Sequence, residues 1–386
     1  MSEVAMSDVA IVGGGPVGLF LASLLVQRGL QVTVLEQRAG DGSGHTRAIG
    51  IHPPALGALA RIGLDGELIR RGVPIRHGVA LAAGRTVARM SFDRVPGPYP
   101  FVLSLPQDRT EMLLERRLHE LDPESLRRGV RVSAIHDDGH RVRLKTCQGG
   151  REAELLARLV IGADGIRSTA RDASGIGLRS REYPDRYLMG DFADSTPFGA
   201  DAALFLAPGG IVESFPLPGG QRRWVVRLND HAAGAGASAA DAAWLAGEVR
   251  RRTGIAVETA SNSMVSAFGV RSRLARRMVA GRCLLIGDAA HEISPIGGQG
   301  MNLGWLDAVE LAPLVPALLA GRDGGAEGFE RRRLRAAARA VRQSEINMAL
   351  GRPLRGGPLT ARNRALAAAA AVPVINRLAA RRFTMQ

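Results

Sequence analysis

The sequence predicts an α/β protein in which a parallel-sheet domain is interrupted by a second, antiparallel sheet. Short apolar runs of buried-strand type, such as residues 9–12 and 283–286, end at glycine and are followed by helix-like segments. Residues 185–230 look different, because three strand-like segments are separated there by two Pro-Gly-Gly turns. A chain of 386 residues is long enough to bury a core in each of two lobes.

The first apolar run, Val9–Val12, leads into a glycine-rich turn. Gly13, Gly15 and Gly18 have the spacing of a dinucleotide-binding loop. In such a loop the first glycine allows a tight turn and the second lets the backbone approach a pyrophosphate. The third lets the following helix, here residues 19–28, lie close to the strand. The free N–H groups and the dipole at the start of that helix attract an anion. These features predict a Rossmann-like nucleotide-binding unit.

A second predicted strand, residues 31–35, ends at Glu36. A carboxylate at this point can accept hydrogen bonds from both hydroxyl groups of a ribose. It would repel a 2′-phosphate, so the site suits FAD or NAD rather than NADP. Gln37 and Arg38 follow directly and are included among the expected nucleotide contacts.

Two further glycine-bearing stretches follow predicted strands. One is the Gly-Ala-Asp-Gly segment at 162–165, and the other begins with Gly287 and Asp288. A carboxylate after a buried strand can reach sugar hydroxyls. The glycines within 297–300 leave backbone N–H groups bare before a helix predicted to begin near Met301, and such donors stabilise negative charge on a reduced flavin ring. All three stretches together predict bound FAD, and therefore an oxidoreductase.

As a set, these stretches resemble the class A FAD-dependent monooxygenases, the aromatic hydroxylases of the p-hydroxybenzoate hydroxylase type. The resemblance covers residues 8–345. It implies a Rossmann-like FAD-binding domain of the GR2 type, an inserted antiparallel β-sheet substrate domain and C-terminal helices. We expect the FAD-binding domain over 1–72, 103–178 and 270–345, the substrate-binding sheet domain over 73–102 and 179–269, and a helical tail over 346–386.

The resemblance also assigns roles to individual motifs. It implies that the first motif and Glu36 hold the ADP part of FAD, and that Gly287 and Asp288 hold the ribityl chain. Asp164 and Gly165 would serve both FAD and the pyrophosphate of a transient NAD(P)H. From the residues alone, a simple turn at Asp164 and a helix N-cap at Asp288 stay open.

Three polar residues are assigned by position only. Arg47 falls where the family has an arginine that holds FAD phosphates, and Gln107 and Arg109 fall in a stretch that lines the flavin. A solvated loop for Arg47 and helix caps for the other two stay open. The expected cofactor-binding residues are Gly13, Gly15, Pro16, Val17, Gly18, Glu36, Gln37, Arg38, Arg47, Gln107, Arg109, Asp164, Gly165, Gly287, Asp288, Pro295, Gly298, Gln299, Gly300, Met301 and Asn302.

The resemblance implies a reaction. NAD(P)H reduces FAD, O2 then forms a flavin C4a-hydroperoxide, and one oxygen atom passes to an aromatic substrate. A phenol of polyketide or lipid origin is the expected substrate, whereas the choice between NADH and NADPH stays open. No catalytic base can be assigned; the candidates are Tyr183, Tyr187, His77 and Tyr99, and His291 is expected to be structural.

Other functions are weighed beside this one. The chain could be a FAD-dependent reductase or oxidase without oxygen insertion, or a flavin-binding module without turnover. A flavin halogenase is disfavoured, because the resemblance implies an active-site lysine and the only lysine, Lys145, falls in a predicted hairpin of the nucleotide domain. The sequence offers no cluster of metal ligands.

The net charge of +14 is concentrated at the C-terminal end, where thirteen arginines and two glutamates follow Gly328. Two explanations fit this basic charge: solvated helix faces, or a contact with an anionic membrane surface. Residues 366–383 permit a helix that lies on a surface. Nucleic-acid binding is disfavoured, because no aromatic residues interleave with the charge. With no signal peptide, no long apolar run and only two cysteines, we expect a cytoplasmic protein, either free or at the inner membrane face, as a monomer or homodimer.

Overall fold

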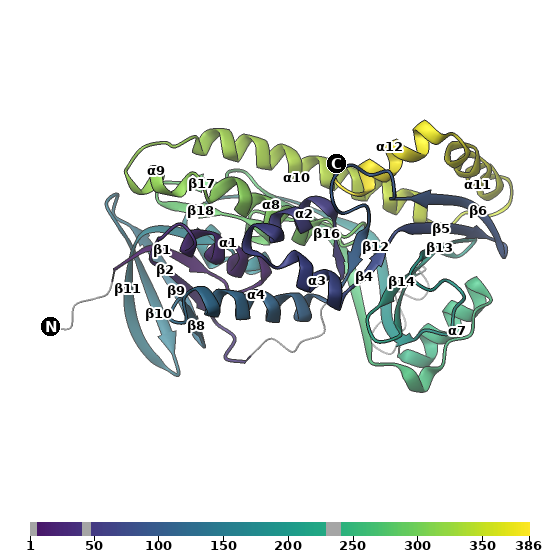
Figure 1. Ribbon diagram of the computed structural model, residues 1–386, viewed down its shortest axis with the longest axis horizontal. Coiled ribbons are helices and arrows are strands. Elements are labelled where there is room, and N and C mark those ends of the chain that lie inside the picture. The colour runs from purple at the N-terminus through teal and green to yellow at the C-terminus, as the bar shows by residue number, and fades with distance from the viewer. Residues whose placement is uncertain (1–5, 41–47, 229–240) are drawn as a thin grey trace.

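The computed structural model describes residues 6–40, 48–228 and 241–386, which form an elongated molecule with one sheet towards each end (Figure 1). Two large sheets have eight strands each, and a third has three. The long helix α10, Ala326–Gly351, runs along one side and contacts α8 as well as strands of both large sheets. The predicted α/β fold with an inserted sheet and C-terminal helices is confirmed.

The first large sheet carries the strands that the apolar runs predicted. Its centre is parallel, in the order β18, β11, β1, β2, β8. An antiparallel hairpin, β9 and β10, is attached to β11, as expected from the Asp-Asp-Gly-His turn. The strands are β1 Met6–Val12, β2 Val32–Glu36, β8 Leu126–Arg128, β9 Val130–Asp137, β10 Val142–Gln148, β11 Arg151–Gly162, β17 Val279–Ala280 and β18 Cys283–Leu285.

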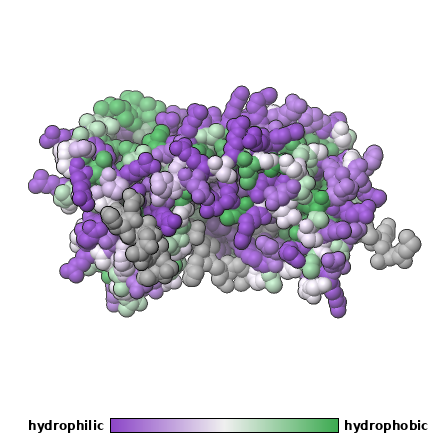
Figure 2. All heavy atoms as spheres, turned by 180° about the vertical axis from the view of Figure 1, so that it is seen from behind, coloured by the Kyte–Doolittle hydropathy of each residue, from purple (hydrophilic) through white to green (hydrophobic). Residues whose placement is uncertain are grey.

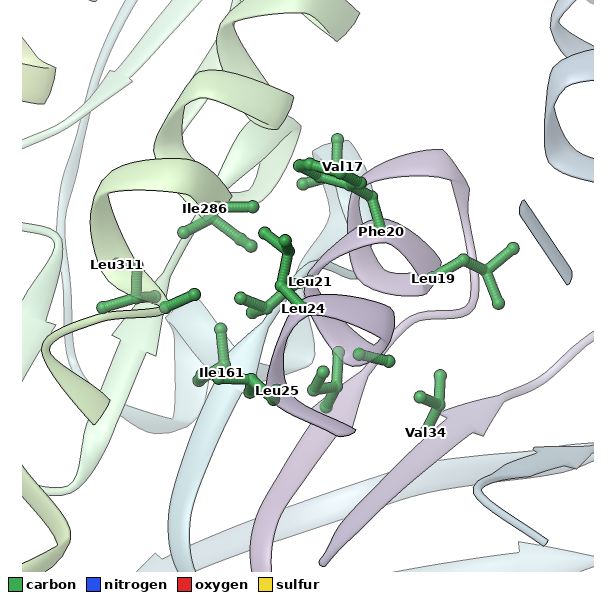
Figure 3. Close-up of a cluster of buried hydrophobic side chains, with 14 of the residues drawn as sticks. Val17, Leu19, Phe20, Leu21, Leu24, Leu25, Val34, Ile161, Ile286 and Leu311 are labelled. Carbon is green, nitrogen blue, oxygen red and sulfur yellow. The ribbon is translucent and has the colours of Figure 1, made fainter. Parts of the chain in front are cut away.

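Helix α1, Pro16–Val26, is apolar around its whole circumference, and this agrees with its burial on all sides. It packs on α4, Gln107–Leu121, and on α8, Gly300–Leu311. Figure 3 shows Leu21 and Leu24 of α1 pointing towards Ile161, Ile286 and Leu311. This dry contact holds the start of α1, and hence the glycine turn before it, in a fixed place on the sheet.

The second large sheet follows the order β19, β16, β12, β15, β14, β13, β5, β6. The predicted meander over 202–228 is confirmed, since β13, β14 and β15 pair antiparallel. Among the described strands of this sheet, only β13 and β5 pair in parallel. The strands are β5 His77–Ala82, β6 Arg85–Ser91, β12 Leu178–Ala193, β13 Ala202–Ala207, β14 Gly210–Leu217, β15 Gln221–Arg227, β16 Met264–Ala275 and β19 His291–Glu292.

Short elements join these layers. Helix α7, Ala242–Thr253, covers one face of the second sheet through a core around Trp224 and Leu245. The remaining elements are β3 Gly50–Ile51, β4 Val73–Ile75, β7 Val102–Ser104, α2 Pro53–Leu59, α3 Asp65–Arg71, α5 Thr169–Ala173, α9 Val315–Leu319 and the 3-10 turns η1 Ala60–Ile62, η2 Gly165–Arg167, η3 Thr259–Ser261 and η4 Gly287–Ala289.

The C-terminal segment differs in detail from the expected tail. Helix α10 continues through the expected boundary at 345/346 without a break. The surface helix permitted over 366–383 is two helices, α11 Gly356–Ala371 and α12 Pro373–Phe383, because Pro373 has no N–H to continue the first. Both pack against β6 at the outer end of the second sheet (Figure 1). Within the described residues, no helix combines the length and hydropathy that a bilayer span requires.

Candidate active site

The four loops with the predicted motifs meet at one edge of the first sheet. They follow the carboxyl ends of β2, β1, β11 and β18, which are neighbouring parallel strands. Ligands of open α/β sheets bind at this edge. The loops line one end of a cavity of about 880 Å³ that extends to the second sheet.

The glycines of the first turn are required by close approaches. Gly13 has φ +106°, and a Cβ on it would lie 2.4 Å from the carbonyl oxygen of Ala163. A Cβ on Gly18 would lie 2.0 Å from the carbonyl oxygen of Gly13. Gly15 has nothing within 4 Å of its Cβ position and lines the cavity. The tight turn and the close helix packing that the spacing predicted are therefore present, and the middle glycine leaves room for a ligand.

Glu36 is almost fully buried at the end of β2 and closes this turn. Its carboxylate accepts hydrogen bonds from the backbone N–H groups of Gly14 and Arg38, both at 2.8 Å, and from Nε of Arg38 at 3.0 Å. Burial raises the pKa of Glu36, but the hydrogen bonds from Arg38 and Gly14 outweigh burial and hold the pKa below its usual 4.5. An ionised Glu36 keeps lone pairs for ribose hydroxyls at the cavity wall.

Two aspartates face the cavity with oxygens that the protein leaves unused. Asp164 accepts from the backbone N–H of Ala170 through Oδ2, while its buried Oδ1 has no partner within the described residues. Asp288 lines the cavity and receives no hydrogen bond from any part of the chain that the structure describes. Burial raises the pKa of both carboxyl groups. Free acceptors at these points fit the hydroxyl-rich chains of FAD.

A buried ionic cluster on the side away from the cavity fixes the loop after β18. Asp307 on α8 accepts from the backbone N–H of Gly287 at 3.0 Å and lies 2.6 Å from Nε2 of His291. Its other oxygen accepts from Nε of Arg333 on α10 at 2.6 Å. Burial lowers the pKa of His291, but the Asp307 carboxylate outweighs burial and raises the pKa above 6.5. His291 does not line the cavity, in keeping with its expected structural role.

Most of the predicted cofactor residues lie together on this part of the cavity wall. Three others lie just beneath it: Gly18, Gln299 and Asn302, whose side-chain amide ties the carbonyl groups of Gly50 and Gly298 together. The predicted residues that line the cavity are Gly13, Gly15, Pro16, Val17, Glu36, Gln37, Arg38, Gln107, Asp164, Gly165, Gly287, Asp288, Pro295, Gly298, Gly300 and Met301.

One predicted arginine of the described residues, Arg109, does not line the cavity. Arg47 lies outside the described residues. Arg109 is exposed on the outer face of α4, beside Met112. Two residues along a helix turn the side chain by about 200°, so the face that carries Gln107 towards the cavity carries Arg109 away from it.

None of the four candidate bases lines the cavity. Tyr183 donates to Glu345, Tyr99 donates to Asp65, and His77 lies between two aspartates. Tyr187 is buried against Phe268, and burial raises its pKa above the usual value of a tyrosine. Burial and the bond to Asp65 raise the pKa of Tyr99 to about 12. These side chains are structural, since each is committed to other protein groups or sealed in the core.

The sequence did not reveal the far wall of the cavity. The second sheet supplies Met189, Phe215 and a lone carboxylate, Glu213. The alternation of Ile211, Glu213 and Phe215 along β14 is a signal that all three share one face. The C-terminal helices also contribute to that wall, through Leu366, Ala369, Ala370, Ile375, Asn376, Ala379 and Phe383.

Comparison with known proteins decides the family. The family model described as "FAD binding domain" matches residues 6–344. The chain belongs to this family. A 6-methylpretetramide 4-monooxygenase of Streptomyces rimosus is 35% identical over 311 residues, which are 79% of this chain and 55% of that protein. A para-nitrophenol 4-monooxygenase of Pseudomonas sp. (strain WBC-3) is 30% identical over 335 residues, 81% of this chain and 79% of that protein.

Solved structures of this FAD-binding family share the fold. The p-nitrophenol 4-monooxygenase PnpA from Pseudomonas putida DLL-E4 has a TM-score of 0.88 at 23% identity, over 98% of this chain and 97% of that chain. The anhydrotetracycline hydroxylase OxyS from Streptomyces rimosus has a TM-score of 0.80 at 27% identity, over 99% of this chain and 76% of that chain. The resemblance to class A flavoprotein monooxygenases and FAD as the cofactor are thus confirmed.

Proposed function

We propose that this protein is an NAD(P)H-dependent FAD monooxygenase that hydroxylates a phenolic aromatic compound. One observation carries the proposal: a single cavity has nucleotide-binding loops at one end and an apolar sheet face at the other. A cavity of this kind is suited to hold a flavin beside an aromatic ring. The expected domain division, with a nucleotide domain interrupted by a substrate domain over 73–102 and 179–269, is proposed with it.

The residues on the cavity wall have defined tasks in this proposal. Glu36 and the N-terminus of α1 bind the ADP part, while Asp164 and Asp288 bind hydroxyl groups. The N–H group of Gly298 donates to the carbonyl oxygen of Pro295 at 2.9 Å, and the other N–H groups of the glycines before α8 stabilise negative charge on the ring. Bound FAD supplies electron transfer from NAD(P)H and the activation of O2. The chain itself orients the substrate and keeps water out.

The far wall sets the substrate class. Apart from Arg89, Glu213 and Arg223, the second sheet offers mainly aliphatic and aromatic side chains, such as Met189, Phe215 and Phe268. Such a wall favours flat hydrophobic rings over small polar ones. Among the relatives are monooxygenases named for 6-methylpretetramide and for para-nitrophenol. We therefore propose a phenol of several fused rings, of polyketide type.

Product analysis tests this function. The FAD-loaded protein is supplied with NADH or NADPH, heavy-isotope O2 and a panel of one-ring to four-ring phenols. We expect at least one phenol to accelerate NAD(P)H oxidation and to gain one labelled oxygen atom. A product that only gains or loses two hydrogen atoms would indicate a reductase or oxidase instead. Bound flavin with no stimulated oxidation would indicate a binding module. The halogenase alternative has no support, because Lys145 is exposed on β10 and lies outside the cavity wall.

We also propose that the C-terminal helices contact an anionic membrane surface. Val372, Val374, Ile375 and Leu378 are exposed around the start of α12, and Figure 2 shows a hydrophobic patch over this corner of the molecule, at the upper left. Arginines of the same helix lie beside them. An apolar stripe flanked by basic side chains suits the boundary between headgroups and acyl chains.

A point substitution tests the membrane contact. Leu378 is 59% exposed and lies outside the cavity wall, so Leu378→Glu should leave the active site intact. We expect it to weaken binding to phosphatidylserine-containing liposomes about tenfold in a sedimentation assay. Met112→Glu, at a 51% exposed position on α4, is the matched control and should bind as the unaltered protein does. Equal binding by all three proteins would refute the contact.

A further inference from the structure

Glu213 stands in the middle of an apolar wall. Successive side chains of β14 alternate between the two faces of the sheet, and Ile211, Glu213 and Phe215 all line the cavity. The cross-strand neighbours of Glu213 are Leu204 on β13 and Val225 on β15, which also line the cavity. The carboxyl group is therefore surrounded on the sheet face by aliphatic and aromatic side chains.

The fold gives this carboxyl group no partner. No side chain or backbone group in the described part of the chain donates a hydrogen bond to Glu213 or forms an ion pair with it. Arg223 on the same face binds Asp191 at 2.7 and 2.8 Å, and Arg227 binds Asp185 at 2.9 Å. An unpaired carboxyl group in an apolar wall destabilises the folded state. A group that the fold does not use, aimed into a cavity, is suited to a ligand.

The wall that carries Glu213 also faces the flavin end of the cavity. Ile296, from the glycine-rich loop before α8, packs into the same buried cluster as Ile211 and Val225. That loop carries the N–H groups proposed to meet the flavin ring. A substrate between the loop and β14 would lie beside the carboxyl group of Glu213 and beside the loop residues that would hold the flavin ring.

Glu213 is also the group of this wall that titrates near neutral pH. Burial raises its pKa to about 7. Burial raises the pKa of Tyr187 on β12 above its usual value, and burial lowers the pKa of His52, across the cavity, to about 4. The basic side chains of this sheet at the cavity are Arg89 on β6 and Arg223 on β15. The two aspartates of the nucleotide loops lie at the other end of the cavity.

We propose that Glu213 is the catalytic base that takes the proton from the hydroxyl group of the substrate. This role rests on the hydroxylation proposed above. The substrate O–H bond breaks, an O–H bond forms on a carboxyl oxygen of Glu213, and the electron pair stays on the substrate oxygen. The ring becomes more nucleophilic at the moment when it receives oxygen, and no further oxidant or reductant is needed for this step. A carboxyl group of matched pKa suits such a transfer.

A binding measurement tests the contact without turnover. β-Naphthol and its methyl ether are titrated into the FAD-loaded full chain at pH values below and above 7. We expect β-naphthol to bind about tenfold more tightly above pH 7, because an ionised carboxylate accepts the stronger hydrogen bond. The methyl ether, which has no hydroxyl proton, should show no such change. Glu213→Gln should abolish the pH dependence for β-naphthol. The assignment would be overturned if the affinity of Glu213→Gln for β-naphthol still changed with pH, or if the affinity for the methyl ether changed with pH in the same way.

Turnover then separates catalysis from binding. With the phenol that is hydroxylated, Glu213→Gln should lower kcat about 100-fold, change KM less, and remove the limb of the pH profile near pH 7. Glu182→Gln, on β12 of the same sheet with a 78% exposed side chain, is the control and should keep the profile of the unaltered protein. If no phenol is hydroxylated while the naphthol contact holds, the proposed function fails and Glu213 remains a hydroxyl-binding residue. Unchanged kcat in Glu213→Gln would refute the catalytic role.

Stability gives a second, independent readout. Because the carboxyl group has no partner, Glu213→Leu should raise the melting temperature of the FAD-loaded protein while hydroxylation is lost. A structural carboxyl group would behave in the opposite way, since its removal would lower the melting temperature. That result would contradict the proposal.

Discussion

At the scale of single residues, one methyl group decides whether the first glycine turn can close. A Cβ at position 18 would lie 2.0 Å from the carbonyl oxygen of Gly13, and this contact is with backbone that cannot give way. We expect Gly18→Ala to push α1 away from β1 and to weaken FAD binding at least about tenfold, as a fluorescence titration would show.

The matched control is a glycine in an open place. Gly57 on α2 has nothing within 4 Å of its Cβ position and no positive φ. Gly57→Ala should bind FAD normally and stabilise the fold by about 0.5 to 1 kcal/mol, because alanine is the better helix former. FAD affinity that is equal in both variants would mean that the turn tolerates a wider spacing than the structure shows.

His52 provides a pH-dependent test of the cavity wall. Its side chain is buried, and its Nδ1 has no partner within the described residues. Burial lowers its pKa from 6.5 to about 4, against a smaller opposing effect of a backbone hydrogen bond with Gly297. Between these two values the unfolded chain binds the proton and the folded protein does not. Stability should therefore fall as the pH is lowered from 6.5 to 4, by about 3 kcal/mol in total.

Denaturant unfolding at several pH values measures how the free energy of unfolding changes with pH. In His52→Gln the part of this pH dependence that comes from His52 should disappear. The substitution His119→Gln, at an exposed position on α4, should leave the pH dependence unchanged. A pH dependence that survives in His52→Gln would show that other groups cause it.

The nucleotide motifs could be predicted at this scale because their chemistry is local. Gly13 and Gly18 need only a short spacing, and Glu36 needs only to follow a strand. The cavity face of Glu213 depends on strands from three parts of the chain. The alternation along β14 shows that Glu213 shares a face with Ile211 and Phe215, but it does not show that this face lines a cavity, so Glu213 was missed. Arg109 was assigned with Gln107 because both fall in a stretch that resembles one lining the flavin, but the helical turn sets the two side chains apart.

At the scale of elements, the Asp307 cluster fastens α8 and α10 to the loop after β18. Asp307 is fully buried and binds Arg333, whose side chain is 7% exposed. We expect Asp307→Asn to cost about 3 to 5 kcal/mol of unfolding free energy, because it leaves a buried guanidinium without its fully buried partner and with only the partly exposed Glu310. Glu310→Gln removes a partner of the same arginine that is 30% exposed, and should cost no more than about 1 kcal/mol. If unfolding in guanidinium chloride showed the same loss of unfolding free energy for both variants, this ranking of the two carboxylates would be contradicted.

Most helices and strands were predictable because their signals are periodic. The meander over 202–228, the hairpin after Val130 and the helix after Pro106 all agree with the structure. The exception is the tail, where an alanine-rich composition hid the break at Pro373 and the continuous run of α10 past residue 345. Composition alone does not show where a helix of small residues stops.

At the scale of the whole molecule, the cavity exists because two sheets and the C-terminal helices meet. The order of the motifs predicted the two sheets. It did not predict that α11 and α12 close the cavity, since their small and aliphatic side chains carry no motif. Contacts between distant segments depend on packing that a single sequence does not display.

An equilibrium titration of the flavin-free chain with FAD is the most direct test of the central claim that strand-end loops far apart in sequence enclose one flavin nucleotide. We expect saturation at one FAD per chain, with the visible spectrum of protein-bound flavin, and a large loss of affinity in Gly18→Ala. The claim would be contradicted if the correctly folded protein did not bind FAD, or if Gly18→Ala bound FAD with unchanged affinity.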